Sequence, residues 1–353
     1  MLIVNELRYT CGVTNHILHL SGGLAADPDT KIWIICGGGN GINRFSGIDV
    51  EIITDERFLH MNRSFSGYIS ALNFLVRFTR DNEIAIIHSH SHYAASLASR
   101  ASRFTKAITV QTNHGLLEEK GRLKQFNADR YIVVNEHVLE YMIENKIAPP
   151  ERINLIRCGI PVPLTPPVKS NTESSLRIIA ASRFTRDKGL DTYIRAVSKI
   201  NETTRQKAEF YIAGEGEMES DLRSENESLN AGVKFAGPVV DMYAMLERTH
   251  VFVYPSRSGS EGFPAVITEA GACNSLVISS DFNGVSNVIV DNKDGLIFRK
   301  ESADELAGKL ELVINDYDSY RNIATAFYRK VKDWYDLDKM VNKHIELYKK
   351  CLK

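Results

Sequence analysis

Four charged side chains in the second half of the chain have the types and the spacing expected of a site for a phosphorylated sugar. Arg183 and Lys188 bracket a loop that follows an apolar, strand-like run and leads into a helical pattern. Two cations beside a helix N-terminus suit the charge of a diphosphate. Glu261 and Glu269 flank the turn in "EGFPAVITEA", and a carboxylate can accept hydrogen bonds from two neighbouring hydroxyls of a sugar. Together these residues predict a nucleotide diphospho-sugar as the ligand.

Backbone groups near these charges fit the same ligand. Gly214 and Gly216 follow another strand-like run, where the missing side chains let a ligand or another backbone segment approach closely. The amides of Gly262 and Phe263 precede a helix that we expect to start at or just after Pro264, a residue that suits a first helical position. Amides in front of a helix are free to bind phosphate or sugar oxygens.

Each of these features also has a simpler interpretation. The two glutamates could be a solvated loop residue and an acid favoured by the helix dipole. Arg183 and Lys188 could be surface charge in front of a helix. The occurrence of both pairs in one part of the chain favours the binding site.

The elements that must position these residues alternate between short apolar runs and helical patterns, which predicts parallel sheets covered by helices on both faces. Six of the ten prolines fall within residues 149–167, which indicates a linker between two halves. The fold class is therefore α/β, with two Rossmann-like, doubly wound domains whose strand ends face each other across a cleft. Strands are expected at residues 2–4, 31–35, 50–53, 84–88, 107–111 and 130–134, and after the linker at 177–181, 209–213, 233–235, 251–254, 275–279 and 295–298.

Composition bears on whether the protein binds nucleic acid and on which cellular compartment it occupies. The net charge is −1, so no overall field favours nucleic acid. The five cysteines are scattered without a zinc spacing, as in a reduced, cytoplasmic protein. No run reaches the roughly 20 apolar residues that cross a bilayer, and the start lacks the pattern of a secretory signal. We expect a cytoplasmic protein, with any membrane contact peripheral. The sequence carries no signal for an oligomeric state.

Several stretches resemble the retaining GT-B glycosyltransferases of family 4 (group 1). In the second half, "SRFTRDKGL" resembles that family's Arg-x4-Lys-Gly signature, "AGEGEMESDL" its Gly-x-Gly turn, "EGFPAVITEA" its Glu-x7-Glu signature, and "NGVSNVIVDNKDGLIF" the segment that follows. In the first half, "IIHSHSHYAASLA" and "TVQTNHGL" resemble its two histidine-bearing strand ends, and "RYTCGVTNHILHL" its first glycine loop. The sequence departs from the family at Cys11, where a glycine is usual, and at Asn274 and Asn287.

The resemblance implies a role for each matching residue. Arg183 and Lys188 would hold the diphosphate, and Glu261 would contact the donor sugar. Glu269 would hold the ribose. His114 would face the donor sugar from the first domain.

Gly12 would complete the phosphate site with its amide, on the same resemblance. The reaction would retain the donor's anomeric configuration and need no metal or other cofactor. The donor is expected to be a UDP-sugar, and the acceptor a glycan or lipid-linked hydroxyl in polysaccharide or glycolipid synthesis. The acceptor-binding domain would span residues 1–163 and the nucleotide-sugar domain residues 164–334, with residues 335–353 forming a helix that returns to the first domain.

Alternative functions remain open on the same residues. A non-hydrolysing nucleotide-sugar epimerase shares the two-domain plan but would need further acid and base carboxylates. A sugar-nucleotide-binding protein without catalysis would be favoured if His114 or Glu261 were missing, and both are present. A nicotinamide dehydrogenase is disfavoured, because the glycines of residues 36–41 follow the second strand and lack the dinucleotide spacing.

Two further patterns could suggest a metal or a membrane. His88, His90 and His92 alternate along a strand and could share a face, but histidines lining a core or a cleft are the favoured interpretation, and no metal is predicted. Residues 57–80 mix arginines with aromatic side chains. They form either a core helix with solvated arginines, the favoured interpretation, or a helix that lies on an anionic membrane.

Overall fold

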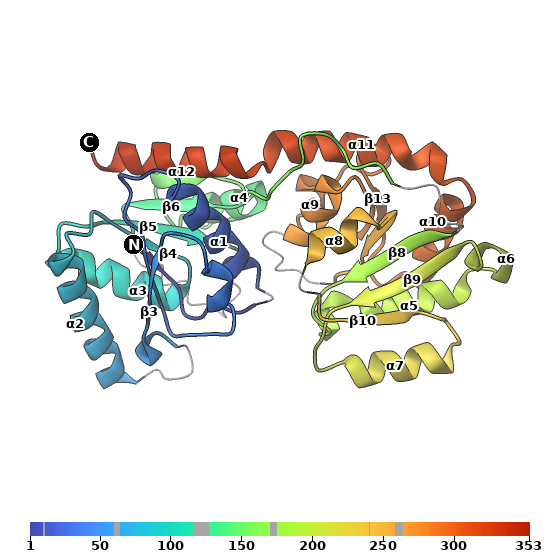
Figure 1. Cartoon of the computed structure of the whole chain (residues 1–353), viewed down its shortest axis with the longest axis horizontal. Helices are drawn as coiled ribbons and strands as arrows, with labels where there is room; N and C mark the ends of the chain where they lie inside the picture. Colours follow the sequence, from blue (N-terminus) through green and yellow to red (C-terminus); the bar gives the residue numbers. More distant parts are fainter. Residues whose placement is uncertain (10, 60–63, 116–126, 170–174, 240, 258–263) are drawn as a thin grey trace. The chain divides into compact units, whose positions relative to one another are not determined.

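The computed structural model describes the chain except for residues 10, 60–63, 116–126, 170–174, 240 and 258–263. Its contacts divide the chain into two compact units (Figure 1). Unit 1 comprises Met1–Gly159 together with Leu337–Lys353, and unit 2 comprises Ile160–Asp336. The boundaries predicted from sequence, after residues 163 and 334, lie near these divisions.

Unit 1 is built on a seven-stranded sheet in which every pairing is parallel. The strand order is β3-β2-β1-β4-β5-β6-β7, so the order reverses between β1 and β4. The strands are β1 (Leu2–Ile3), β2 (Trp33–Cys36), β3 (Glu51–Thr54), β4 (Ile86–Ser89), β5 (Ile108–Asn113), β6 (Arg130–Val133) and β7 (Ile153–Leu155).

Helices cover the sheet of unit 1, and the last helix of the chain is one of them. A side chain at Gly23 of α1 would place its Cβ 2.3 Å from Cγ2 of Val341 in α12. The missing side chain therefore lets the two helices pack closely, and Figure 1 shows α12 (red) running beside α1. The longer helices are α1 (Gly12–Leu24), α2 (Phe65–Asp81), α3 (His92–Ala101), α4 (Glu136–Glu144) and α12 (Leu337–Cys351).

Unit 2 repeats the plan with a six-stranded parallel sheet in the order β10-β9-β8-β11-β12-β13. Here the order reverses between β8 and β11. Its strands are β8 (Leu176–Ala181), β9 (Ala208–Ala213), β10 (Lys234–Gly237), β11 (Val251–Tyr254), β12 (Leu276–Ser280) and β13 (Leu296–Phe298). Its helices are α5 (Leu190–Lys199), α6 (Glu202–Arg205), α7 (Glu219–Ser228), α8 (Met242–Glu247), α9 (Ala265–Ala272), α10 (Ala303–Asn315) and α11 (Tyr317–Trp334).

The predicted α/β class is confirmed, and each predicted strand is present with its ends shifted by at most two residues. The sequence analysis was wrong about residues 149–167, which it treated wholly as a linker. Ile153–Leu155 form β7, which pairs with β6 at the edge of the sheet. An edge strand tolerates neighbouring prolines because it pairs on one side only, and this one is short and half-buried. None of the described helices is both long enough and apolar enough to cross a membrane.

Candidate functional site

The two cations predicted to bind a diphosphate lie in unit 2 where the strand order reverses. The loop that carries Arg183 and Lys188 follows β8, and the neighbouring strand β11 ends at Tyr254. The amide of Arg257 donates to the carbonyl of Asp187 at 2.7 Å, so the segment after β11 joins the loop after β8. The carboxyl ends of strands at such a reversal are where ligands bind in open α/β sheets.

Arg183 and Lys188 both act on one carboxylate of this loop. Lys188 Nζ lies 3.6 Å from Oδ2 of Asp187 and 6.0 Å from the ring centre of Tyr254. Burial raises the pKa of Asp187, but the Thr185 hydroxyl, Lys188 and Arg183 together hold that pKa below its usual value. The side chain of Arg183 is exposed and that of Lys188 is half-buried. The loop therefore concentrates positive charge at the end of β8, as a diphosphate site requires.

Gly189 fixes the point where this loop enters α5. Its φ is +66°, in the left-handed region that favours glycine. A Cβ there would lie 2.1 Å from the carbonyl oxygen of Pro255. The start of α5 is thereby held against the end of β11, with Lys188 directly before the helix.

Gly214 and Gly216 support the loop through close backbone packing. A Cβ on Gly214 would lie 1.9 Å from the carbonyl oxygen of Ser182, and one on Gly216 would lie 2.6 Å from that of Phe184. The Phe184 amide also donates to the Glu215 carbonyl at 2.8 Å. The sequence left open whether a ligand or another backbone segment approaches these glycines. In the structure a backbone segment, that of Ser182 and Phe184, lies against them. Ligand binding by them stays a prediction.

Arg257 is a part of the site that the sequence analysis missed. Its guanidinium donates to Asp191 at 2.7 Å, to Thr192 Oγ1 at 2.8 Å and to the carbonyl of Arg186 at 3.1 Å. These bonds tie the cationic loop to the first turn of α5. The available signal was a cation directly after the strand in "VFVYPSR", but nothing in the sequence shows that it turns back onto a loop almost 70 residues earlier.

Glu269 lies one turn inside α9 and is only 7% exposed. The helix begins at Ala265, with Pro264 in the capping position before it. Burial, and then the charges of Glu269 and Cys273, raise the pKa of Tyr243. A largely buried carboxylate requires compensating interactions, and Glu269 is not without a partner. Glu261, Gly262 and Phe263 lie outside the described residues.

In unit 1, Gly12 is the first residue of α1, behind an N-cap, Cys11, whose side chain makes no capping hydrogen bond. A Cβ on Gly12 would meet no heavy atom of the described residues within 4 Å. The α-carbon of Gly12 thus borders open space among the described residues.

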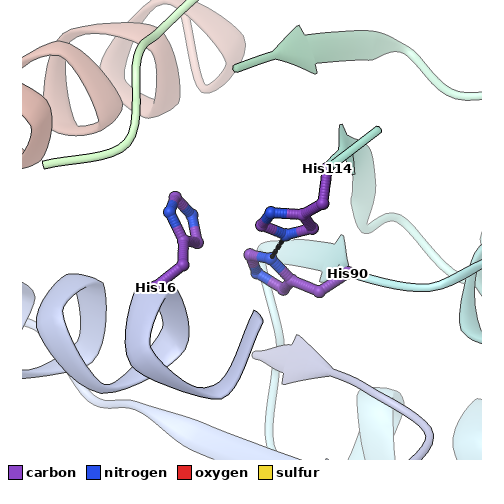
Figure 2. Close-up of side chains that lie close together, drawn as sticks. All are labelled: His16, His90 and His114. Atoms are coloured by element: carbon purple, nitrogen blue, oxygen red, sulfur yellow. Dashed lines mark hydrogen bonds between the residues drawn. The ribbon is translucent and has the colours of Figure 1, made fainter. Parts of the chain in front are cut away.

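The histidines of unit 1 gather in one group, named here the histidine cluster. Figure 2 shows His16 reaching from α1 towards His90 and His114, which follow β4 and β5. Nδ1 of His90 lies 3.2 Å from Nε2 of His114. The ring centres of His16 and His114 are 4.8 Å apart in an edge-to-face arrangement. The whole cluster consists of His16, His88, His90, His114 and His344.

Three members could in principle hold a metal. His16, His90 and His114 each offer a nitrogen, and these atoms lie within 4.8 Å of one another. Histidines that bind a metal almost always donate their other N–H to a second group. Both nitrogens of His16 and Nε2 of His90 are buried without a hydrogen-bond partner in the described structure. That argues against a metal, and the absence of a metal stays a prediction.

The cluster is neutral near pH 7. Burial is the main cause that lowers the pKa of His16, His88 and His90 well below 6.5, and neighbouring histidines lower it further. Burial, and then His344, lower the pKa of His114 to about 4. The favoured interpretation of His88 and His90 as core residues agrees with their burial.

Comparison with known proteins identifies the family. Residues 165–330 match the family described as glycosyl transferases group 1, and residues 10–162 match the one described as glycosyltransferase family 4. The chain belongs to the group 1, family 4 glycosyltransferases. Both halves of this glycosyltransferase are therefore matched.

Curated relatives of the glycosyltransferase are distant. An α-1,4-N-acetyl-D-galactosaminyltransferase of Campylobacter jejuni, named for a PP-undecaprenol-linked glycan, is 29% identical over 47% of this chain and 46% of its own length. The gpi3 subunit of the phosphatidylinositol N-acetylglucosaminyltransferase of Schizosaccharomyces pombe is 26% identical over 72% of this chain and 59% of its own length. The chain thus spans less than two thirds of the length of these relatives, 46% of one and 59% of the other.

Solved structures match the fold over the entire length of the glycosyltransferase. A glycosyltransferase from Rickettsia africae superposes with a TM-score of 0.81 at 19% identity, covering 100% of this chain and 98% of that one. Anabaena HepE in complex with UDP and glucose gives 0.80 at 14% identity, covering 99% and 98%. Together with the two parallel sheets, these neighbours establish the two-domain, Rossmann-like GT-B fold.

Proposed function

We propose that this protein transfers a sugar from a nucleotide diphospho-sugar to a hydroxyl of a glycan or lipid-linked acceptor. One observation carries the proposal. In a chain of this family, Arg183, Lys188 and the start of α5 are held together at the strand-order reversal of unit 2. This position and charge suit the diphosphate of a donor.

The charged residues divide into two roles in the donor site. Arg183 and Lys188 bind the diphosphate and stabilise the negative charge that develops on it as the sugar departs. Glu269 accepts hydrogen bonds from the ribose hydroxyls. Glu261, Gly262 and Phe263, outside the described residues, and Pro264 keep their predicted place beside the donor sugar and phosphates.

Two residues of unit 1 are proposed, on the family resemblance, to contact the donor. Gly12 offers an amide at the open start of α1, which suits an anionic oxygen. His114 is neutral and half-buried, so it can exchange a hydrogen bond with a sugar hydroxyl without adding charge. Gly214 and Gly216 act on the donor indirectly, through the loop that they support.

The finer features of the reaction follow from the family and from its neighbours. Retention of the anomeric configuration and independence from metal are proposed on the family resemblance. A UDP-sugar is favoured because Anabaena HepE was solved with UDP and with UDP-glucose. A lipid-linked acceptor is favoured because the Campylobacter and Schizosaccharomyces relatives are named for undecaprenol-linked and phosphatidylinositol acceptors.

A peripheral membrane contact through α2 belongs to the same proposal. Phe65 and Ile69 on this helix are 85% and 40% exposed, and Phe104 nearby is 57% exposed. Near the end of this helix, Arg80 donates to the carbonyl of Phe104 at 2.6 Å, so this cation lies beside an exposed aromatic residue. Such a surface suits the cytoplasmic face of an anionic membrane.

Sedimentation with vesicles tests the membrane contact. The wild-type protein should sediment with anionic vesicles. The double variant Arg77→Glu, Arg80→Glu should stay in the supernatant. Arg223→Glu, an exposed site on α7 of unit 2, is the matched control and should leave retention unchanged. Equal retention of all three proteins would remove the membrane from the proposal.

A thermal-shift panel tests the donor site. UDP, GDP, ADP and their common sugars are added to the wild type, Lys188→Ala and Glu269→Ala. A nucleotide at 100 times its Kd stabilises the folded state by about 2.7 kcal/mol, which corresponds to roughly 5–10 °C for a unit of this size.

One nucleotide family should raise the melting temperature of the wild type and of neither variant. Lys199→Ala, an exposed lysine at the far end of α5, is the control and should respond like the wild type. The absence of a shift with every nucleotide would refute the proposed donor site.

A further inference from the structure

The histidine cluster contains one hydrogen bond whose direction can be worked out. Nδ1 of His90 and Nε2 of His114 lie 3.2 Å apart. Both rings are neutral near pH 7, so each carries a single N–H. One of the two nitrogens must donate and the other must accept.

Burial decides between the two directions. If His114 donated, His90 would accept on Nδ1 and carry its proton on Nε2. That Nε2 is buried and has no hydrogen-bond partner in the described structure. An orphaned buried N–H is rarer and more costly than an unpaired acceptor. His90 therefore carries its proton on Nδ1 and donates it to His114.

His344 in the same cluster supports this assignment. Its Nδ1 lies 2.9 Å from the carbonyl oxygen of Met340, which can only accept, so Nδ1 of His344 is protonated. Its Nε2 is then an acceptor, and this atom too is buried without a partner. At His344, as proposed for His90, the unpaired buried nitrogen is therefore the acceptor.

The surroundings hold His90 in place. The ring of His88 lies 4.2 Å from that of His90, at an interplanar angle of 37°. His88 is itself fixed at both nitrogens, by Thr112 Oγ1 at 2.7 Å and by the Tyr348 hydroxyl at 2.6 Å. His90 is fully enclosed, whereas His114 is half-buried. His114 is therefore the member of the pair that can meet a ligand.

We propose that His90 is a positioning residue that holds His114 as its Nδ1–H tautomer, so that His114 meets its ligand as a neutral hydrogen-bond donor. Since Nε2 of His114 accepts from His90, its single proton lies on Nδ1. The ligand atom that it recognises is an acceptor oxygen, and under the proposed function this is a hydroxyl oxygen of the donor sugar. His114 then orients the sugar and does not act as a base.

Nitrogen-15 NMR of protein labelled at histidine tests the tautomer directly. The His114 signals are assigned from the spectrum of His114→Gln. At pH 7.5 the wild type should show Nε2 of His114 unprotonated and Nδ1 protonated. His90→Leu, which removes the donor, should lose this pattern. His90→Asn, whose amide nitrogen can take the place of Nδ1, should restore it, and His137→Asn on α4 should leave it unchanged.

Two results on the wild-type protein alone would overturn the proposal. A protonated Nε2 on His114 would mean that His114 donates to His90. A shift of the His114 signals on adding EDTA would mean that a metal holds the ring. A wild-type pattern retained in His90→Leu would show that His90 does not set the tautomer.

Kinetics with the donor found in the nucleotide panel then tests the consequence. His90→Leu should lower kcat about tenfold, the factor expected for losing one neutral hydrogen bond, with a small change in KM for the donor. His90→Asn should recover most of the lost kcat. Equal kcat for His90→Leu and the wild type would refute the positioning role. If no donor binds, the proposed function fails, while the NMR result still decides the tautomer.

Discussion

Gly189→Ala should damage both the stability and the donor site of unit 2. The substitution places a Cβ 2.1 Å from the carbonyl oxygen of Pro255, at a residue whose φ is +66°. The atom that it meets belongs to the backbone, so no side-chain rotation can relieve the contact. The loop with Arg183 and Lys188 would have to move away from the end of β11.

Gly232→Ala separates the two causes of this damage. Gly232 has a similar φ of +74°, but a Cβ there meets no heavy atom of the described residues within 4 Å. The left-handed conformation costs a non-glycine residue about 1–2 kcal/mol at either position. Overpacking adds about 1–3 kcal/mol, and only at Gly189. We expect Gly189→Ala to lose about 2–5 kcal/mol and Gly232→Ala to lose the smaller part alone.

Urea unfolding and the nucleotide panel measure the two effects. Gly189→Ala should unfold at a lower urea concentration than Gly232→Ala and should bind nucleotide more weakly, whereas Gly232→Ala should bind like the wild type. Equal stability of the two variants would refute the close contact with Pro255. Unchanged nucleotide affinity of Gly189→Ala would refute the role of the loop.

Three further predictions concern other contacts. Arg257→Leu should weaken nucleotide binding by removing the hydrogen bonds that fasten the cationic loop, and Arg257→Lys should not restore binding because an ammonium cannot reproduce the planar fork; full affinity of the lysine variant would contradict this. Gly23→Ala should destabilise unit 1 by about 1–3 kcal/mol through its contact with Val341, and Val341→Ala should relieve part of the loss, so additive losses in a double-mutant cycle would disprove the contact. Burial holds the pKa of the histidine cluster below 6.5, and at about 4 for His114 and His344. The stability of unit 1 should therefore be full above pH 6.5 and fall by about 1.4 kcal/mol per pH unit for each such histidine as the pH drops towards 4. In a Trp334→Phe background Trp33 is the single tryptophan, and its fluorescence would report urea unfolding at pH 7.5 and at pH 5, with no difference between the two if the cluster were solvated.

The fold was predictable because its signals are local. Each buried parallel strand is a short apolar run, and β11 was predicted with the bounds that the structure has. β7 was missed because Ile153–Leu155 lie at the sheet edge, half-buried, next to two prolines. Pairing with β6 on one side is enough to form that strand, and such pairing leaves no pattern in its own residues.

The site was predictable only in part, for the same physical reason. Arg183 and Lys188 could be proposed as a pair from the sequence because both stand on one loop. Arg257 and His16 were missed because each acts on residues far away in the sequence, and the spacing within a segment says nothing about them. The glycines after β9 were found as sites of close approach, but only the structure shows which group approaches.

The place of α12 has a consequence for the order of folding. Unit 1 contains Leu337–Lys353, and this segment supplies His344 of the histidine cluster and Tyr348, which packs against His88. A ribosome therefore releases every residue of unit 2 before unit 1 has all of its parts. Domains fold as units once they are complete. In a growing chain, the second unit can therefore finish folding before the first. The hydrogen bond between His88 and Tyr348 cannot form until the whole of unit 2 has been synthesised.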